Sequence, residues 1–197
     1  MGRDGFEHLL MLQCAPTFAG MKAASLVCFR RCDFDDLDGM VASCQRLFTP
    51  AGIVTLKLYE DSCRTMLYFY RPALLKRVLK RPGAVDLLRG EGYPTLGGID
   101  SLLRHLMRRL SEHGDFPHEI GLFLGYPPPD VKCFIENHGH GAKCTGVWKV
   151  YQNVAAAKVI FSRYRHCTEE GCIMLREAGS MAALAGSLGK RRVCIDM

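Results

Sequence analysis

The residues Val54, Leu56 and Leu58 alternate with polar residues within 53–59. A period of two is typical of a β-strand with one buried face. The next segment, 65–71, is apolar on both faces, as a central strand covered on both sides would be. We therefore predict an antiparallel hairpin in which 65–71 is the more buried strand.

A further short strand is predicted at 147–151, around Trp148, which is the only tryptophan of the chain. A large ring between two valines on a strand is well suited to cover one face of a sheet. We therefore expect Trp148 to have a structural role.

Apolar residues at helical spacing predict the main helices. The pattern at 34–48 is regular, with Asp33 as the expected N-cap and Thr49-Pro50 as the end. The pattern at 99–113 places apolar residues, most of them leucines, on one face and charged residues on the other. Shorter helices are predicted at 72–81, 85–89, 116–127 and 131–137, and one more is predicted after Asn153.

The segment before residue 30 is predicted less completely. Residues 6–12 have the pattern of a short helix, and Ala15 precedes Pro16, which disfavours the helical conformation at Ala15. We therefore expect the helix to break there. Thr17 could cap a new helix, or the chain could be extended toward 26–29, and the pattern leaves both open.

The order of these elements is helices, a hairpin, more helices, then one strand and a helix. Because strands and helices do not alternate regularly, we expect an α+β fold rather than a doubly wound parallel sheet. The prediction is a single domain over 1–167, with a small, mostly antiparallel sheet of about three strands packed with several helices. The Ala/Gly-rich, basic extension 168–197 is expected to be loosely packed.

The composition is that of an ordinary globular protein, with 48% hydrophobic and 23% charged residues among 197. No apolar run approaches the roughly 18 residues of a membrane span, so we expect a cytoplasmic protein without a membrane partner. The net charge is +6, but no long arginine-rich run occurs, which disfavours nucleic-acid binding. The sequence assigns neither a cofactor nor a specific partner.

The ten cysteines contain no C-x-x-C pair, which excludes zinc ribbons and thioredoxin-like redox sites. In a reducing compartment they are expected to be free thiols, metal ligands or nucleophiles. The best-spaced metal candidates are His138, His140 and Cys144, since glycines between them allow the three side chains to converge. A glycine-rich loop also acquires histidines by chance, and we prefer that explanation.

Several familiar catalytic motifs are absent from the sequence. There is no Walker-type phosphate loop and no G-x-G-x-x-G. There is also no H-E-x-x-H zinc motif and no G-x-S-x-G nucleophile elbow. These absences exclude the corresponding classes of nucleotide-binding proteins, metalloproteases and serine hydrolases.

The leading hypothesis is a cysteine-dependent enzyme of hydrolase or transferase type. Cys14 precedes the possible helix start at Thr17, whose unpaired N–H groups would lower the pKa of the thiol. His118 is the candidate base, and Glu119 is the third candidate catalytic residue. The simpler alternative is that Cys14 packs in the core and that His118 or Glu119 caps a helix, so the sequence does not decide whether the protein is an enzyme.

Two other functions remain open on the same residues. One is a metal- or ligand-binding accessory protein without catalysis, with Cys14, His118, Glu119 and Lys22 around a metal or an anionic molecule. The other is a regulatory or interaction module, which would need a contiguous basic face to bind nucleic acid, and the sequence shows none. A metal needs three or four converging ligands, whereas a hydrolase needs a nucleophile, a base and an oxyanion pocket.

Three blocks of the sequence carry a resemblance to a known family. They are the segment 14–22 (CAPTFAGMK), the segment 116–131 with its Phe-Pro-His-Glu-Ile-Gly start, and the segment 146–151 (GVWKVY). Together they resemble the bacterial family known as domain of unknown function 3793, over about residues 6–168. The resemblance implies one folded domain and implies no activity, substrate or cofactor.

Overall fold

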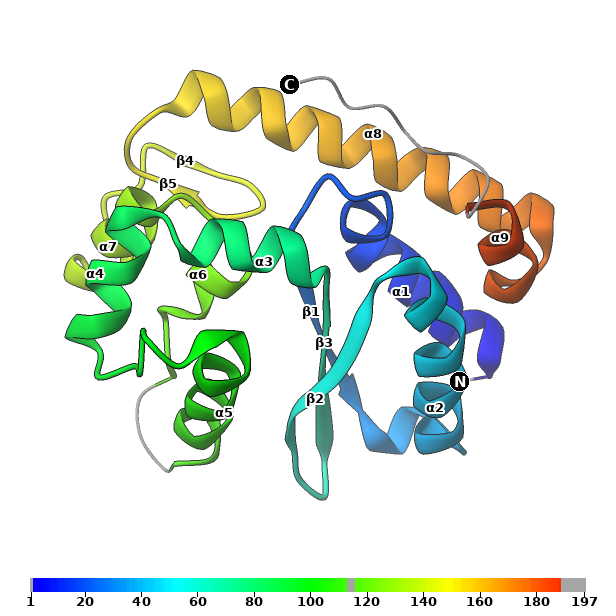
Figure 1. Cartoon of the computed structure of the whole chain (residues 1–197). Coiled ribbons are helices and arrows are strands. Elements are labelled where there is room, and N and C mark those ends of the chain that lie inside the picture. The colour runs from blue at the N-terminus through cyan, green and yellow to red at the C-terminus, as the bar shows by residue number, and fades with distance from the viewer. Residues whose placement is uncertain (1, 113–115, 189–197) are drawn as a thin grey trace. The chain divides into compact units, whose positions relative to one another are not determined.

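The computed structural model describes residues 2–112 and 116–188. The chain forms two compact units (Figure 1). The first consists of the chain up to Arg71 together with the chain from Tyr164 onward, and the second is Pro72–Arg163. No helix of the described residues combines the length and the apolar character that crossing a membrane requires.

A three-stranded antiparallel sheet is the centre of the first unit. Its strands are β1 (Ala24–Arg30), β2 (Val54–Glu60) and β3 (Arg64–Tyr70), in the order β1-β3-β2. The predicted hairpin is therefore confirmed, and so is the expectation that its second strand is the more buried one, since all of β3 after Arg64 is buried. The segment whose conformation the sequence left open is β1, which pairs with the other side of β3.

The edge strand β2 differs from the predicted alternation. A β-bulge lies between Lys57 and Tyr59, and the pairing places Thr55 opposite Phe69. Phe69 belongs to the core, so Thr55 is buried and Val54, which was expected to be buried, is exposed. The bulge adds one residue to the strand and so interrupts the period of two.

Helices α1 (Arg3–Phe18) and α2 (Leu37–Phe48) cover one face of this sheet (Figure 1). Two short 3-10 helices lie between them and the strands, at Arg31–Asp33 and Thr49–Ala51. The N-cap of α2 is Asp36, whose carboxylate accepts a hydrogen bond from the Gly39 N–H, rather than the predicted Asp33. The predicted end before Thr49-Pro50 is confirmed.

The break predicted at Ala15-Pro16 is wrong, because α1 continues through Pro16 to Phe18. Arg71 stabilises this end of the helix. Its guanidinium donates to the carbonyl oxygens of Thr17 and Phe18 in the last turn, where the carbonyl groups lack the usual partner four residues further along the helix. Pro16 has no N–H group, so the helix lacks one hydrogen bond near its end. Arg71, which directly follows β3, stabilises that end.

The C-terminal helices complete the core of the first unit. They are α8 (Val154–Ala178), which begins in the second unit, and α9 (Met181–Leu188). Leu175, Met181 and Leu184 are buried in the same core cluster as α1 and α2. Residues 168–178 and 181–188 are thus helical, and Leu175, Met181 and Leu184 are packed, whereas the sequence predicted loose packing there. Residues 189–197 lie outside the described residues.

The second unit is mainly helical. It contains three helices, α3, α4 and α5, then the short α6, then α7 and a two-stranded hairpin. Their bounds are α3 Pro72–Leu79, α4 Pro82–Gly90, α5 Gly98–Ser111, α6 Ile120–Phe123, α7 Pro128–Glu136, β4 Cys144–Thr145 and β5 Lys149–Val150. Both sheets are antiparallel and most of the other residues are helical, so the predicted α+β class is confirmed.

Candidate functional site

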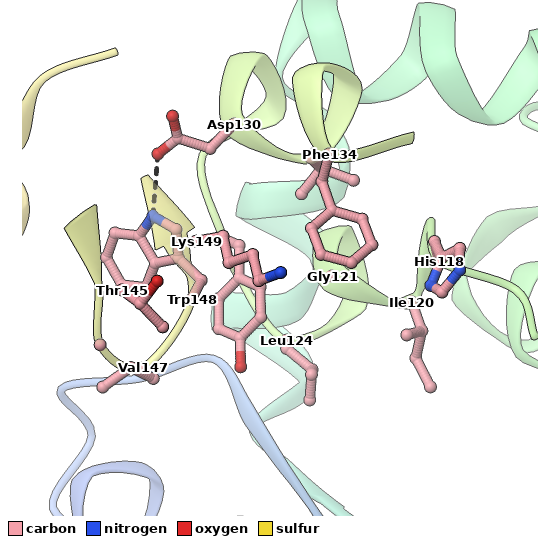
Figure 2. A pocket seen from close by; sticks show the side chains of 13 residues that line it. His118, Ile120, Gly121, Leu124, Asp130, Phe134, Thr145, Val147, Trp148 and Lys149 are labelled. Atoms are coloured by element: carbon pink, nitrogen blue, oxygen red, sulfur yellow. Dashed lines mark hydrogen bonds between the residues drawn. The ribbon is translucent and has the colours of Figure 1, made fainter. Parts of the chain in front are cut away.

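A pocket of about 310 Å³ lies within the second unit, between the α6–α7 segment and the β4–β5 hairpin. Its wall is mainly apolar and includes the aromatic rings of Tyr126, Phe134 and Trp148. His118, Thr145 and Lys149 are the polar side chains that line it besides Asp130 (Figure 2). Pockets of a few hundred Å³ with apolar walls and a few polar groups are the usual form of small-molecule sites.

Asp130 joins the two halves of this pocket. It lies in the first turn of α7, is 4% exposed, and accepts a hydrogen bond of 2.8 Å from the indole Nε1 of Trp148. Its other oxygen accepts from the backbone N–H groups of Tyr151 and Gln152, at 2.9 and 3.0 Å. A single buried carboxylate therefore fixes both the ring of Trp148 and the end of the hairpin.

Trp148 is held by rings as well as by Asp130. It stacks on Tyr126 with 5.4 Å between ring centroids and meets the edge of Phe161 at 4.5 Å. Gly146 permits the second contact, because a Cβ at that position would clash with the Phe161 ring. Trp148 thus has the structural role expected of it, and one side of it lines the pocket.

Lys149 brings a positive charge to the pocket wall. Its ammonium donates to the carbonyl oxygen of Gly139 at 2.7 Å and lies 5.6 Å from the centroid of the Phe134 ring. Within the residues that the structure describes, no carboxylate forms an ion pair with it. Gly139 has φ of +77°, a conformation that glycine adopts without strain.

His118 lines the pocket on the other side of Phe134 (Figure 2). The imidazole is exposed and packs edge-on against Phe134, with 5.0 Å between ring centroids, and it also lies 5.8 Å from Phe116. It is therefore accessible to a molecule in the pocket.

Glu119, its neighbour in sequence, has a different environment. The carboxylate is 2% exposed, accepts a hydrogen bond of 2.6 Å from the Tyr93 hydroxyl, and lies 2.9 Å from Arg109 Nη1. Burial and the hydrogen bond to Glu119 raise the pKa of Tyr93. Among the described contacts, none joins Glu119 to His118, so the contacts of Glu119 are those of a buried structural carboxylate.

Cys14 lies in the first unit, inside α1, and is fully buried. Of the two possibilities left open at Thr17, a new helix does not start there, because α1 continues through Thr17 to Phe18. The N–H groups that would have lowered the pKa of the thiol therefore belong to the last turn of α1. Burial instead raises the pKa of Cys14. Because His118 belongs to the second unit, the pairing of Cys14 with His118 stays a prediction.

Two polar side chains accompany Cys14 in the first unit. The hydroxyls of Thr17 and Ser25 are buried and lie 2.9 Å apart, and the Ser25 hydroxyl lowers the pKa of the Cys14 thiol by less than burial raises it. Burial lowers the pKa of Lys22 to about 8, and the nearby thiol partly offsets this effect. The two hydroxyls thus satisfy one another inside the protein.

The candidate metal ligands His138, His140 and Cys144 lie in the loop before and within β4. Both histidines are exposed, and His138 has a left-handed backbone with φ of 49°. Nowhere in the described ranges, 2–112 and 116–188, do three His, Cys, Asp or Glu side chains gather in a geometry that could hold a metal ion.

The sequence analysis missed Asp130, Lys149 and Phe134 as site residues. A signal was present, because the pocket is built largely from two of the blocks that carry the family resemblance, 116–131 and 146–151. Those blocks are separated in sequence, and the hydrogen bonds of Asp130 together with the stacking of Trp148 on Tyr126 show that they meet.

Comparison with known proteins gives one family. A family model described as "Protein of unknown function (DUF3793)" matches residues 10–185, which is most of the chain. No curated protein and no solved structure matches.

Proposed function

The chain belongs to the DUF3793 family, and we propose from the geometry of its pocket that it is a non-catalytic ligand-binding protein. The observation that carries the proposal is the pocket of about 310 Å³, whose aromatic wall is fixed by a buried carboxylate. Its ligand is a small molecule with an apolar ring, since the wall that includes Tyr126, Phe134 and Trp148 is mainly apolar and favours aromatic contacts.

The stability of the wall supports this function. Asp130, Trp148 and the hairpin backbone hold one another, so the pocket is formed before a ligand arrives. A preformed site loses less conformational entropy on binding than one that must order its side chains. Binding of a small ring compound therefore needs no rearrangement of the second unit.

A test uses a neutral ring compound, 2-naphthamide, and saturation-transfer NMR with the full chain. We expect transfer to the naphthyl protons from the wild-type protein and its loss in Val147→Asp, which places a charge on the pocket wall. The matched control is Val159→Asp, because Val159 is also exposed and does not line the pocket. No transfer from the wild-type protein, or equal transfer from both variants, would contradict the proposal.

We also propose that the protein works in a reducing compartment such as the cytoplasm. Nine cysteines are free thiols in the described part of the chain. Free thiols in such number are typical of proteins that are not exposed to an oxidising environment. Alkylation of the protein under native and denaturing conditions after extraction without reductant tests this, and disulfide-linked peptides would contradict it.

A further inference from the structure

We propose that the ligand of the pocket carries a carboxylate that pairs with the ammonium of Lys149 while its ring packs against the aromatic wall. This inference rests on the proposed ligand-binding function and adds the chemical class of the ligand. Two charges of the pocket carry it. Lys149 has no carboxylate partner among the described residues 2–112 and 116–188, and both oxygens of Asp130 accept hydrogen bonds.

The ammonium of Lys149 is placed for a ligand by two contacts. The hydrogen bond to the Gly139 carbonyl uses one of its three N–H donors, and the Phe134 ring lies beneath the charge. Figure 2 shows the amine of Lys149 directed toward the space beside Phe134 rather than toward Asp130. Two donors of a half-buried ammonium thus remain for an acceptor in the pocket.

The described wall of the pocket supplies no carboxylate that is free to pair with the Lys149 ammonium. Among the residues that the structure describes, Asp130 is the only acidic one that lines it, and its two oxygens accept the hydrogen bonds from Trp148, Tyr151 and Gln152. In Figure 2 its carboxylate lies above the indole, and the dashed line joins the two. The charge balance of the cavity therefore favours an anionic ligand.

The nature of the wall favours a carboxylate attached to a ring over a free inorganic anion. The Lys149 ammonium is one point charge beside Phe134, Trp148 and aliphatic side chains, and the described wall offers no second lysine or arginine. A phosphate carries more charge and is usually held by several cationic or N–H donors. A carboxylate can be paired by one ammonium, and the ring attached to it replaces water on the apolar wall.

The experiment compares two molecules of the same shape, 2-naphthoate and 2-naphthamide, by isothermal titration calorimetry with the full chain. At neutral pH the first is an anion and the second is neutral. We expect the wild-type protein to bind 2-naphthoate at least about tenfold more tightly, because a charge-assisted hydrogen bond contributes more than a neutral one.

The variant Lys149→Met keeps the apolar stem and removes the charge. We expect the affinity for 2-naphthoate to fall by about tenfold or more, and that for 2-naphthamide to change by less than about twofold. The control is Lys143→Met, which removes an exposed charge just before the same hairpin and outside the pocket wall. It should leave both affinities within about twofold of the wild type.

The outcomes separate the two proposals. If 2-naphthamide binds and 2-naphthoate binds no more tightly, the pocket binds ring compounds and the inference about the carboxylate is overturned. It is overturned as well if Lys149→Met weakens the binding of both molecules equally. The same holds if Lys143→Met weakens the binding of 2-naphthoate as much as Lys149→Met does. If neither molecule binds to the wild-type protein, the proposed function fails first. The wild-type comparison stands even if Lys149→Met does not fold.

Discussion

Asp130 shows how much of the second unit depends on one side chain. Its carboxylate accepts three hydrogen bonds, two of them from the backbone after β5, and it is almost completely buried. A buried carboxylate with three donors is stable because each oxygen is satisfied. Because every oxygen of Asp130 is engaged, even a substitution that keeps its shape should lower the stability of the protein.

We predict that Asp130→Asn lowers the free energy of unfolding by about 2–3 kcal/mol. The amide keeps one acceptor oxygen and replaces the other with an NH2 group, so at least one of the three N–H donors loses its acceptor and faces another donor. Urea unfolding followed by circular dichroism measures the change. The control Glu136→Gln makes the same chemical change at the exposed end of α7, where Glu136 lies 3.7 Å from Lys132, and it should cost less than about 0.5 kcal/mol. Equal effects of the two substitutions would contradict the structural role of Asp130.

Cys14 is the second residue whose environment leads to a prediction. Burial raises the pKa of its thiol, so at pH 7.5 the fraction of reactive thiolate is very small. Limiting iodoacetamide followed by peptide mapping should therefore label Cys14 more slowly than the exposed Cys28, Cys32 and Cys63. Labelling in denaturant controls for the intrinsic reactivity of each peptide.

The opposite result would have a clear meaning. If Cys14 in the native protein reacts before the exposed cysteines, the hypothesis of a thiol nucleophile gains support. The variant His118→Ala then tests whether His118 acts on that thiol, because slower labelling of Cys14 in this variant would link the two residues.

At the scale of elements, α1 depends on the arginine that follows β3. The guanidinium of Arg71 donates to Thr17, to Phe18 and to the carbonyl oxygen of Ala51 at 3.3 Å. It thereby links the end of α1 to the turn after α2. The last carbonyl groups of a helix have no partners of their own, so a donor from elsewhere stabilises that end.

We predict that Arg71→Met lowers the free energy of unfolding by about 1–3 kcal/mol and speeds amide exchange at Ala19, whose N–H bonds to the Ala15 carbonyl. Hydrogen exchange measured by NMR reports both effects. Arg64→Met is the control, since Arg64 lies at the exposed start of β3 and pairs with Asp61 in solvent. If the exchange of Ala19 is unchanged in Arg71→Met, Pro16 is tolerated for another reason.

At the scale of the whole molecule, the core of the first unit joins distant parts of the sequence. Phe6 and Leu10 of α1 share a cluster with Met181 and Leu184 of α9. The carboxylate of Glu7 adds a polar link, because it accepts a hydrogen bond of 2.7 Å from the Met181 N–H. The two ends of the described chain therefore stabilise one another.

We predict that Met181→Ala lowers the free energy of unfolding by about 2–4 kcal/mol, since the side chain is 2% exposed and its removal leaves a cavity. Ile173→Ala is the control, because Ile173 is 51% exposed and loses little burial, and its effect should stay below about 1 kcal/mol. Thermal unfolding followed by circular dichroism compares the two variants. Similar shifts of the midpoint would show that α9 does not support the core.

Local patterns in the sequence were sufficient for the α+β class, the β2–β3 hairpin and the main helices. Burial of one face imposes a period on the chain, and turn and cap residues mark where an element ends. These signals act over a few residues, so they are visible in one sequence. The apolar character of 65–71 predicted the central strand for this reason.

The tertiary structure alone decided the features that depend on residues far apart in sequence. The helix through Pro16 needs Arg71, and the packed α9 needs the face of α1. The pocket needs Asp130 to meet the hairpin around Trp148. Each rests on hydrogen bonds or packing between separate segments, and such contacts leave no periodic pattern in either segment because the partner's position is set by the whole fold.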